Sequence, residues 1–128
     1  MKKIRGYNFS RSFMGERVPQ HVQNIVIKDY CAKNNLNFLL SVTEYSMPNS
    51  YYMLNSLIKN SKNISGVVMY SLFQMPEIDS ERKKMFYKFL KKKKKIFFAC
   101  ENLKFESLKD FKRLENIWFV KKLMSEKI

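Results

Sequence analysis

Four short apolar runs, separated by segments with helical periodicity, constrain the fold of this chain more than any other feature. They lie at residues 3–9 (KIRGYNF), 37–42 (NFLLSV), 66–71 (GVVMYS) and 96–100 (IFFAC). Strands that alternate with helices pair in parallel, because each helix supplies the long crossover that a parallel pair needs. The pattern predicts an α/β fold, a three-layer sandwich with a mainly parallel sheet of about four strands.

The intervening segments predict four helices. Pro19 suits the first position of a helix, because its φ angle is fixed near the helical value. Val22, Val26 and Tyr30 recur at helical spacing after it, with Ile25 alongside, and are expected to form its buried face. Further helices are expected after Pro48, over residues 79–92, and after residue 107. The chain of 128 residues has no linker or repeat, so residues 1–128 are expected to form a single domain.

Composition narrows the class of protein. No run approaches the roughly 18 apolar residues of a membrane span, and no apolar stretch follows the basic N-terminus as in a signal peptide. We therefore expect a cytoplasmic protein without membrane insertion. One histidine and two separated cysteines do not make an ordinary zinc site, and no glycine-rich nucleotide motif is present. No metal and no cofactor is predicted.

The net charge of +14 is unevenly distributed. Residues 81–128 hold sixteen lysines and arginines against six acidic residues, whereas residues 1–80 hold nine against five. Such an excess is typical of proteins that bind nucleic acid, but a lysine run at a helix end is also favoured by the helix dipole. The sequence therefore favours nucleic acid less than other partners.

Residues 6–31 contain nearly every residue type that can do chemistry, including the single histidine of the chain. Right-handed crossovers bring the loops after the parallel strands to one edge of the sheet, where such folds bind ligands. Arg11 and Arg17 in the first loop are suited to an anion such as phosphate, or could pair with nearby carboxylates. Ser10 could be a nucleophile with His21 or Glu44 as its base, or a turn residue.

The remaining candidates share a position at this edge or on the helix that begins there. The predicted ligand-binding set is Tyr7, Arg11, Glu16, Arg17, Gln20, Gln23, Asn24, Tyr45, Tyr70 and Ser71, with Ser10, His21 and Glu44 as the catalytic candidates. Amide, hydroxyl and carboxylate groups together could hold sugar hydroxyls or transfer protons. The residues leave open whether the protein is an enzyme.

Segments of this edge resemble a known family. The sequences GYNFSRSFMGERVPQHVQN, IVIKDYC, LLSVTEYSMP and GVVMYSLFQMP are similar to the sporadic carbohydrate cluster proteins of bacteria. That resemblance implies a role in the biosynthesis of a surface carbohydrate. The ligand would be an anionic sugar, such as a sugar phosphate, a nucleotide sugar or an acidic sugar.

The order of features also resembles the catalytic domain of serine recombinases, the resolvases and invertases. Gly6, Tyr7 and Ser10 are similar to the first strand of that family, which ends in a nucleophilic serine, and Gln20 or Gln23 to its helical glutamine. The resemblance implies a resolvase-like fold, with a flavodoxin-like one as the alternative. The family's Asp-Arg-Leu-x-Arg motif is missing.

Where that motif would follow the central strand, this chain has Phe73, Gln74 and Glu77. Phosphoryl transfer needs arginines to match the charge of its transition state. The sequence thus favours a carbohydrate-pathway protein that binds or acts on an anionic sugar. The alternatives are a degenerate recombinase-like DNA-binding protein and a non-catalytic interaction protein, which could be a homo-oligomer.

Overall fold

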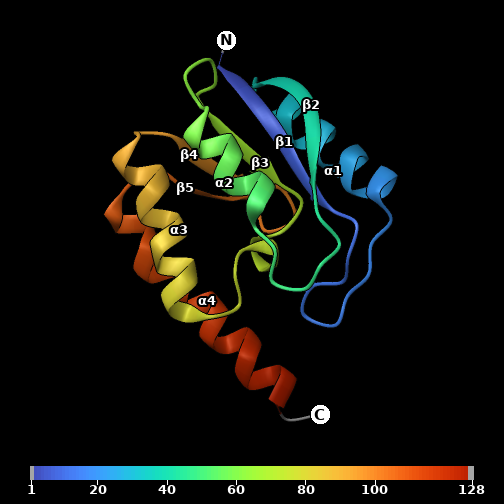
Figure 1. Cartoon of the computed structure of the whole chain (residues 1–128), viewed down its shortest axis with the longest axis vertical. Helices are drawn as coiled ribbons and strands as arrows, with labels where there is room; N and C mark the ends of the chain where they lie inside the picture. Colours follow the sequence, from blue (N-terminus) through green and yellow to red (C-terminus); the bar gives the residue numbers. More distant parts are fainter. Residues whose placement is uncertain (1, 127–128) are drawn as a thin grey trace.

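A five-stranded sheet forms the centre of the computed structural model, which describes residues 2–126 (Figure 1). Its order is β2-β1-β3-β4-β5, and its strands are β1 (Lys3–Phe9), β2 (Asn37–Glu44), β3 (Gly66–Met69), β4 (Lys95–Phe98) and β5 (Leu103–Phe105). The first four are parallel, and β5 returns antiparallel to β4. The expected mainly parallel α/β sandwich is confirmed, with one strand more than predicted.

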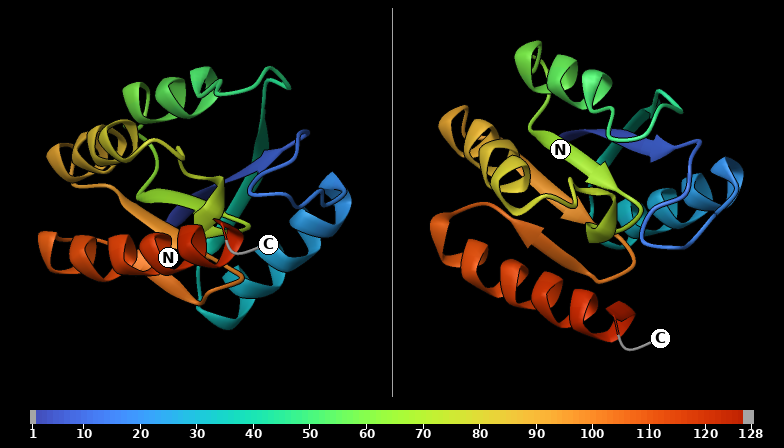
Figure 2. Two further views of the ribbon diagram at one scale, coloured as in Figure 1. Left: turned by 90° about the horizontal axis from the view of Figure 1, so that it is seen from below. Right: turned by 60° about the horizontal axis from the view of Figure 1, so that its bottom comes forward.

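Four α-helices surround the sheet: α1 (Gln20–Lys33), α2 (Tyr52–Lys59), α3 (Asp79–Lys91) and α4 (Leu108–Glu126). A short 3₁₀ helix, η1 (Leu72–Gln74), follows β3. Figure 2 shows α2 and α3 together on one side of the sheet, α1 on the other, and α4 along the edge formed by β5. None of the helices within residues 2–126 is both long and apolar enough to cross a membrane.

Side chains alternate across the sheet and divide the core in two. Val67, Met69 and Ile96 face α2 and α3 in the larger cluster, which also contains Trp118 of α4. Val68 faces α1 in the smaller one. Alternation along each strand therefore lets one short parallel sheet bury apolar residues on both faces.

The buried face of α1 differs from the predicted one. Gln23, Ile27 and Cys31 are buried, whereas Val22, Val26 and Tyr30 are only half-buried and Ile25 is 63% exposed. Apolar residues occur on several sides of this helix, so periodicity does not fix its rotation. The face toward the sheet is instead the one that carries Gln23, Ile27 and Cys31, with a polar residue at its N-terminal end. Pro19 precedes the helix as its N-cap residue.

Candidate functional site

The loops after β1, β2 and β3 meet at one edge of the sheet, as predicted, and Arg11 joins two of them. Its Nη1 donates to the carbonyl of Tyr45 at 2.7 Å and its Nη2 to that of Ser50 at 2.9 Å. The guanidinium also lies over the Phe9 ring, 4.0 Å from its centroid, and 5.1 Å from that of Tyr51. These contacts give Arg11 a structural role, because each terminal nitrogen of its guanidinium donates to a backbone carbonyl of the segment after β2.

Glu44 ends β2 and is 1% exposed. Its carboxylate accepts hydrogen bonds from the backbone N–H groups of Met53 and Leu54, at 3.0 and 3.1 Å, in the first turn of α2. Further donors are the Tyr45 N–H and the Ser50 hydroxyl, at 3.1 and 3.3 Å. A carboxylate suits this position because the first N–H groups of a helix have no partner within it. Glu44 therefore caps α2.

Tyr7 completes the environment of this carboxylate. Its hydroxyl donates to Glu44 Oε1 at 2.8 Å, and its side chain is fully buried. Burial, followed by the neighbouring Glu44 charge, raises the pKa of Tyr7 well above its ordinary value of 10.0. Tyr7 thus keeps its proton and donates a permanent hydrogen bond within the core.

Gln23 connects three segments and is fully buried. Its Nε2 donates to the carbonyls of Phe9 and Val18, each at 2.8 Å. Its Oε1 accepts from the Phe9 N–H at 3.0 Å and from Gln74 Nε2 at 2.8 Å. All the strong hydrogen-bonding sites of this amide are used. Gln23 therefore joins the end of β1 to α1 and η1, and Gln74 occupies a position where the recombinase motif would place a charged residue.

Asn24 belongs to a second polar network on the α1 side of the sheet. Its Oδ1 accepts from Asn8 Nδ2 at 3.0 Å and from the Ser41 hydroxyl at 2.7 Å. The Thr43 hydroxyl donates to Asn8 Oδ1 at 2.7 Å, with a longer contact to Gln20 Oε1 at 3.4 Å. These bonds join α1 to β1 and β2.

Ser10 and Arg17 share an open cleft of about 450 Å³ with Val18, Pro19 and Gln20. Glu16 and His21, which are close to these residues in the sequence, are exposed to solvent. Within residues 2–126, no hydrogen bond joins Ser10, His21 and Glu44 to one another. The structure therefore does not assemble the three predicted catalytic residues into a connected set, and their roles remain predictions.

The residues after β3 have partners of their own. The Ser71 hydroxyl donates to Glu101 Oε2 at 2.8 Å, and the Leu72 N–H donates to the other oxygen of the same carboxylate, also at 2.8 Å. A hydrogen bond with Cys100, together with burial, raises the pKa of Tyr70 to about 12. Tyr45 is exposed, and its ring lies 5.7 Å from that of Tyr52.

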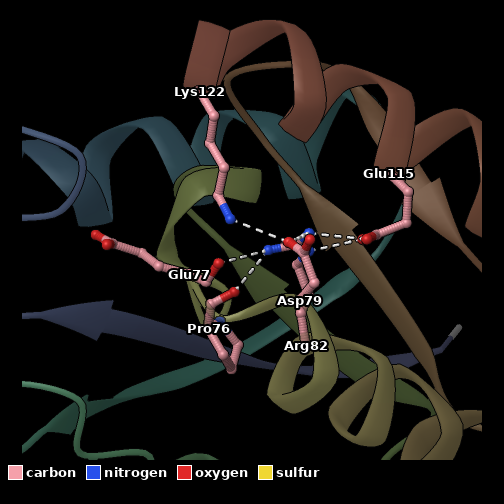
Figure 3. Close-up of polar contacts among 6 residues, drawn as sticks. All are labelled: Pro76, Glu77, Asp79, Arg82, Glu115 and Lys122. Atoms are coloured by element: carbon pink, nitrogen blue, oxygen red, sulfur yellow. Dashed lines mark hydrogen bonds and ion pairs between the residues drawn. The ribbon is translucent and has the colours of Figure 1, made fainter. Parts of the chain in front are cut away.

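Arg82 is a buried charge that the sequence interpretation missed (Figure 3). Its Nε and Nη2 donate to the two carboxylate oxygens of Glu115 at 2.6 and 2.7 Å, and Nη2 also donates to Asp79 at 2.7 Å. Nη1 donates to the carbonyls of Pro76 and Glu77 at 3.0 and 3.1 Å. The burial of Arg82 could have been found from helical spacing, since residues 82, 85, 86 and 89 share one face of the helix.

Unlike the buried and fully bonded Arg82, the basic residues at the ends of α2 and α3 are exposed. We call Lys59, Lys88, Lys91 and Lys92 the lysine surface; with Asn55 and Ile58 they line an open hollow of about 540 Å³. Their ammonium groups contact neutral acceptors at most, such as Asn55 Oδ1 at 2.6 Å from Lys88 Nζ. In the described part of the chain, none of these four lysines forms a salt bridge within 4.0 Å.

This geometry is similar to that of two recombinase structures. The N-terminal catalytic domain of TP901-1 integrase aligns with 95% of this chain and 97% of its own length, at 15% identity and a TM-score of 0.58. A resolvase family site-specific recombinase from Streptococcus pneumoniae aligns with 93% of this chain and 88% of its own length, at 8% identity and a TM-score of 0.64. No family model and no curated protein matches the sequence. The fold is resolvase-like.

These comparisons correct the predicted function. The resemblance to carbohydrate cluster proteins, and the role in surface-carbohydrate biosynthesis derived from it, find no support among them, whereas two recombinases share the fold over nearly the whole chain. The short segments behind that prediction also have local structural explanations, since Arg11, Gln23 and Glu44 are engaged within the protein. The comparisons support the resolvase-like fold that the second resemblance implied.

Proposed function

We propose that this protein binds duplex DNA through the lysine surface and does not carry out strand transfer. The observation that supports DNA binding most directly is that one hollow of the surface is lined by four lysines, none of which has a carboxylate partner among residues 2–126. Lysine side chains bind DNA phosphates without regard to sequence, and the release of counterions from DNA drives the association. The resolvase-like fold is consistent with this class of partner, because both similar structures are recombinases.

The lysine surface lies at the ends of two neighbouring helices. Lys59 is the last residue of α2, and Lys88, Lys91 and Lys92 lie at the C-terminal end of α3. The negative end of a helix dipole favours cations, and this accounts for some basic residues there. It does not account for four of them around one hollow, where like charges repel until an anion neutralises them.

The position of this surface separates it from Ser10. Helices that connect parallel strands run antiparallel to those strands, so the C-terminal ends of α2 and α3 lie at the amino-terminal edge of the sheet. Ser10 follows the carboxyl end of β1, at the opposite edge. DNA bound to the lysine surface would therefore not present a phosphate to Ser10.

The identity and contacts of the residues after β3 are also inconsistent with strand transfer. Phe73 packs edge-to-face on Trp118, with ring centroids 5.1 Å apart, and Gln74 is engaged with Gln23. Neither position supplies the positive charge that a phosphoryl transition state requires. Formation of a covalent complex between the protein and a cleaved duplex would contradict this half of the proposal.

Fluorescence anisotropy with a labelled duplex of arbitrary sequence, measured over a series of salt concentrations, tests the binding half. Four lysine–phosphate contacts predict that log K falls with log[salt] with a slope of about −3.6. The triple substitution of Lys59, Lys91 and Lys92 to Gln should reduce that slope to about −1. A matched triple substitution of Lys28, Lys109 and Lys112 to Gln, which lie outside the lysine surface, should leave it unchanged.

Two results would overturn the proposal. One is the absence of duplex binding at low salt, where phosphate contacts are strongest. The other is an equal loss of affinity in the two triple variants, which would indicate a general effect of net charge rather than a surface.

A further inference from the structure

A second basic cavity lies away from the lysine surface, on the side of the sheet covered by α1. It encloses about 460 Å³ between the C-terminal end of α1, strands β4 and β5, and the first turns of α4. Lys95 and Phe97 line it, whereas the alternate residues Ile96 and Phe98 belong to the core cluster that faces α2 and α3. The two basic regions are thus on opposite faces of the sheet.

Four cations from separate segments converge on this cavity. Lys2 precedes β1, Lys95 begins β4, Lys104 lies in β5, and Arg113 lies in α4. Lys2 and Lys95 are close enough that hydrogen bonding and repulsion from Lys95 lower the pKa of Lys2. The fold holds two lysine side chains together here, and keeping a charge on both is unfavourable unless negative charge lies beside them.

Two carboxylates near the cavity balance only part of this charge. Glu106 contacts Lys95 Nζ at 3.2 Å and Lys104 Nζ at 3.3 Å. The Oδ2 atom of Asp110, which lines the cavity, accepts from the N–H groups of Glu106 and Ser107 at 2.9 and 3.2 Å. Arg113 has no salt bridge within the described residues.

The rest of the lining is apolar or carries amide groups. Tyr30, Leu36, Phe97 and Leu103 contribute apolar surface, and Asn34 and Asn102 contribute amides. A volume of this size is within the range of small-molecule sites, which combine apolar walls with a few placed polar groups. A ligand that matches the cavity therefore needs a compact anionic group and an apolar or aromatic part.

We propose that this cavity binds a phosphate monoester of mononucleotide size, with its phosphate held by Lys2, Lys95, Lys104 and Arg113. An arginine can bind two phosphate oxygens at once, and lysines add point charges. The rings of Tyr30 and Phe97, whose centroids are 6.1 Å apart, form part of the wall beside the nonpolar portion of the ligand. This proposal does not depend on DNA binding by the lysine surface.

Isothermal titration calorimetry with 5′-AMP tests it, with adenosine and inorganic phosphate as partial ligands. We expect 5′-AMP to bind at least tenfold more tightly than adenosine, because the phosphate supplies charged hydrogen bonds. Arg113→Ala and Lys104→Ala should each weaken 5′-AMP about tenfold or more, whereas Lys109→Ala, on α4 outside the cavity, should not. Glu106→Gln should strengthen binding, because it removes the carboxylate that competes for Lys95 and Lys104.

The phosphate could belong to a free small molecule or to a DNA backbone, and the same variants distinguish the two. We expect the double substitution of Lys104 and Arg113 to Ala to abolish 5′-AMP binding and to leave the salt slope of duplex binding unchanged. If 5′-AMP and inorganic phosphate produce no binding heat at millimolar concentration, the proposal is wrong. It is also wrong if the double variant loses duplex affinity while 5′-AMP binding persists, or if Lys109→Ala weakens 5′-AMP equally.

Discussion

The edge that contains Arg11, Gln23 and Glu44 and the lysine surface are both strongly polar, but they differ in what their polar groups contact. At the edge, each of these three side chains bonds to backbone or side-chain groups of other segments. On the lysine surface, four ammonium groups have no carboxylate partner among residues 2–126. A dense cluster of varied polar residues can therefore be structural, whereas four exposed lysines at the ends of two helices remain available to bind a partner.

The largest loss of stability is expected for a buried polar group with many partners, and Arg82 is the extreme example. Arg82→Met should lower the free energy of unfolding by about 3 kcal/mol, because it leaves a partly buried Glu115 and two carbonyls without donors. Urea denaturation measures this effect. Arg113→Met, the same change at an exposed position of α4, should stay within about 0.5 kcal/mol, and equal effects would contradict the role assigned to Arg82.

Glu44→Ala should cost about 2–3 kcal/mol, because the N–H groups of Met53 and Leu54 and the Tyr7 hydroxyl lose a buried acceptor. Glu16→Ala, at an exposed carboxylate of the first loop, is the matched control. A Glu44→Ala protein with unchanged stability would show that the carboxylate is not needed as a cap, and would reopen a functional role for it.

Tyr7→Phe should cost about 1 kcal/mol at neutral pH, because it removes one buried hydrogen bond. It should also change the response to alkali. The raised pKa of Tyr7 means that its contribution is fully present below its ordinary value of 10.0 and is lost as the pH rises toward the folded-state value. Stability of the parent should therefore fall more steeply above that pH than stability of Tyr7→Phe, as measured by urea denaturation across the alkaline range. Parallel curves would contradict this.

The smallest effect on stability is expected for the lysine surface. The triple substitution of Lys59, Lys91 and Lys92 to Gln should change the free energy of unfolding by no more than about 0.5 kcal/mol, since these side chains are exposed and form no salt bridge with any residue from 2 to 126. Thermal denaturation beside the duplex-binding assay measures both properties of one variant. A large destabilisation would mean that these lysines support the fold. The lysine surface would then not differ in this respect from the sheet edge that contains Arg11, Gln23 and Glu44.

The sequence predicts those elements whose signal is local and strong. β3 and α3 lie close to their predicted positions, because a β-branched run specifies β3 and a clear helical face specifies α3. β1 also lies at its predicted position, Lys3–Phe9. β5 was missed because it has only three residues, Leu-Lys-Phe, and exists through pairing with β4. The predicted rotation of α1 was wrong because a buried glutamine, Gln23, shares the face toward the sheet with Ile27 and Cys31, while other apolar residues lie on different sides of the helix.

The candidate site shows the same limit more clearly. The positions of Gln23 and Glu44 at the strand edge follow from the order of elements, but the partner of Gln23 on η1 is 51 residues away in the sequence. The sequence around a glutamine does not show whether its amide is free to bind a ligand or is already hydrogen-bonded to distant residues. The comparison with solved structures gave the carbohydrate interpretation no support and showed a resolvase-like fold instead.

The sequence alone determined that strands and helices alternate, that the sheet is mainly parallel, and that positive charge concentrates in the second half of the chain. The alternation of elements follows from the spacing of apolar residues within short segments, and the charge distribution follows from a count of charged residues. Only the tertiary structure decided which polar groups are free, because hydrogen-bond partners come from separate loops that the sheet brings together. It left the four lysines of the lysine surface without carboxylate partners among residues 2–126, and it engaged Arg11, Gln23 and Glu44 in hydrogen bonds within the protein.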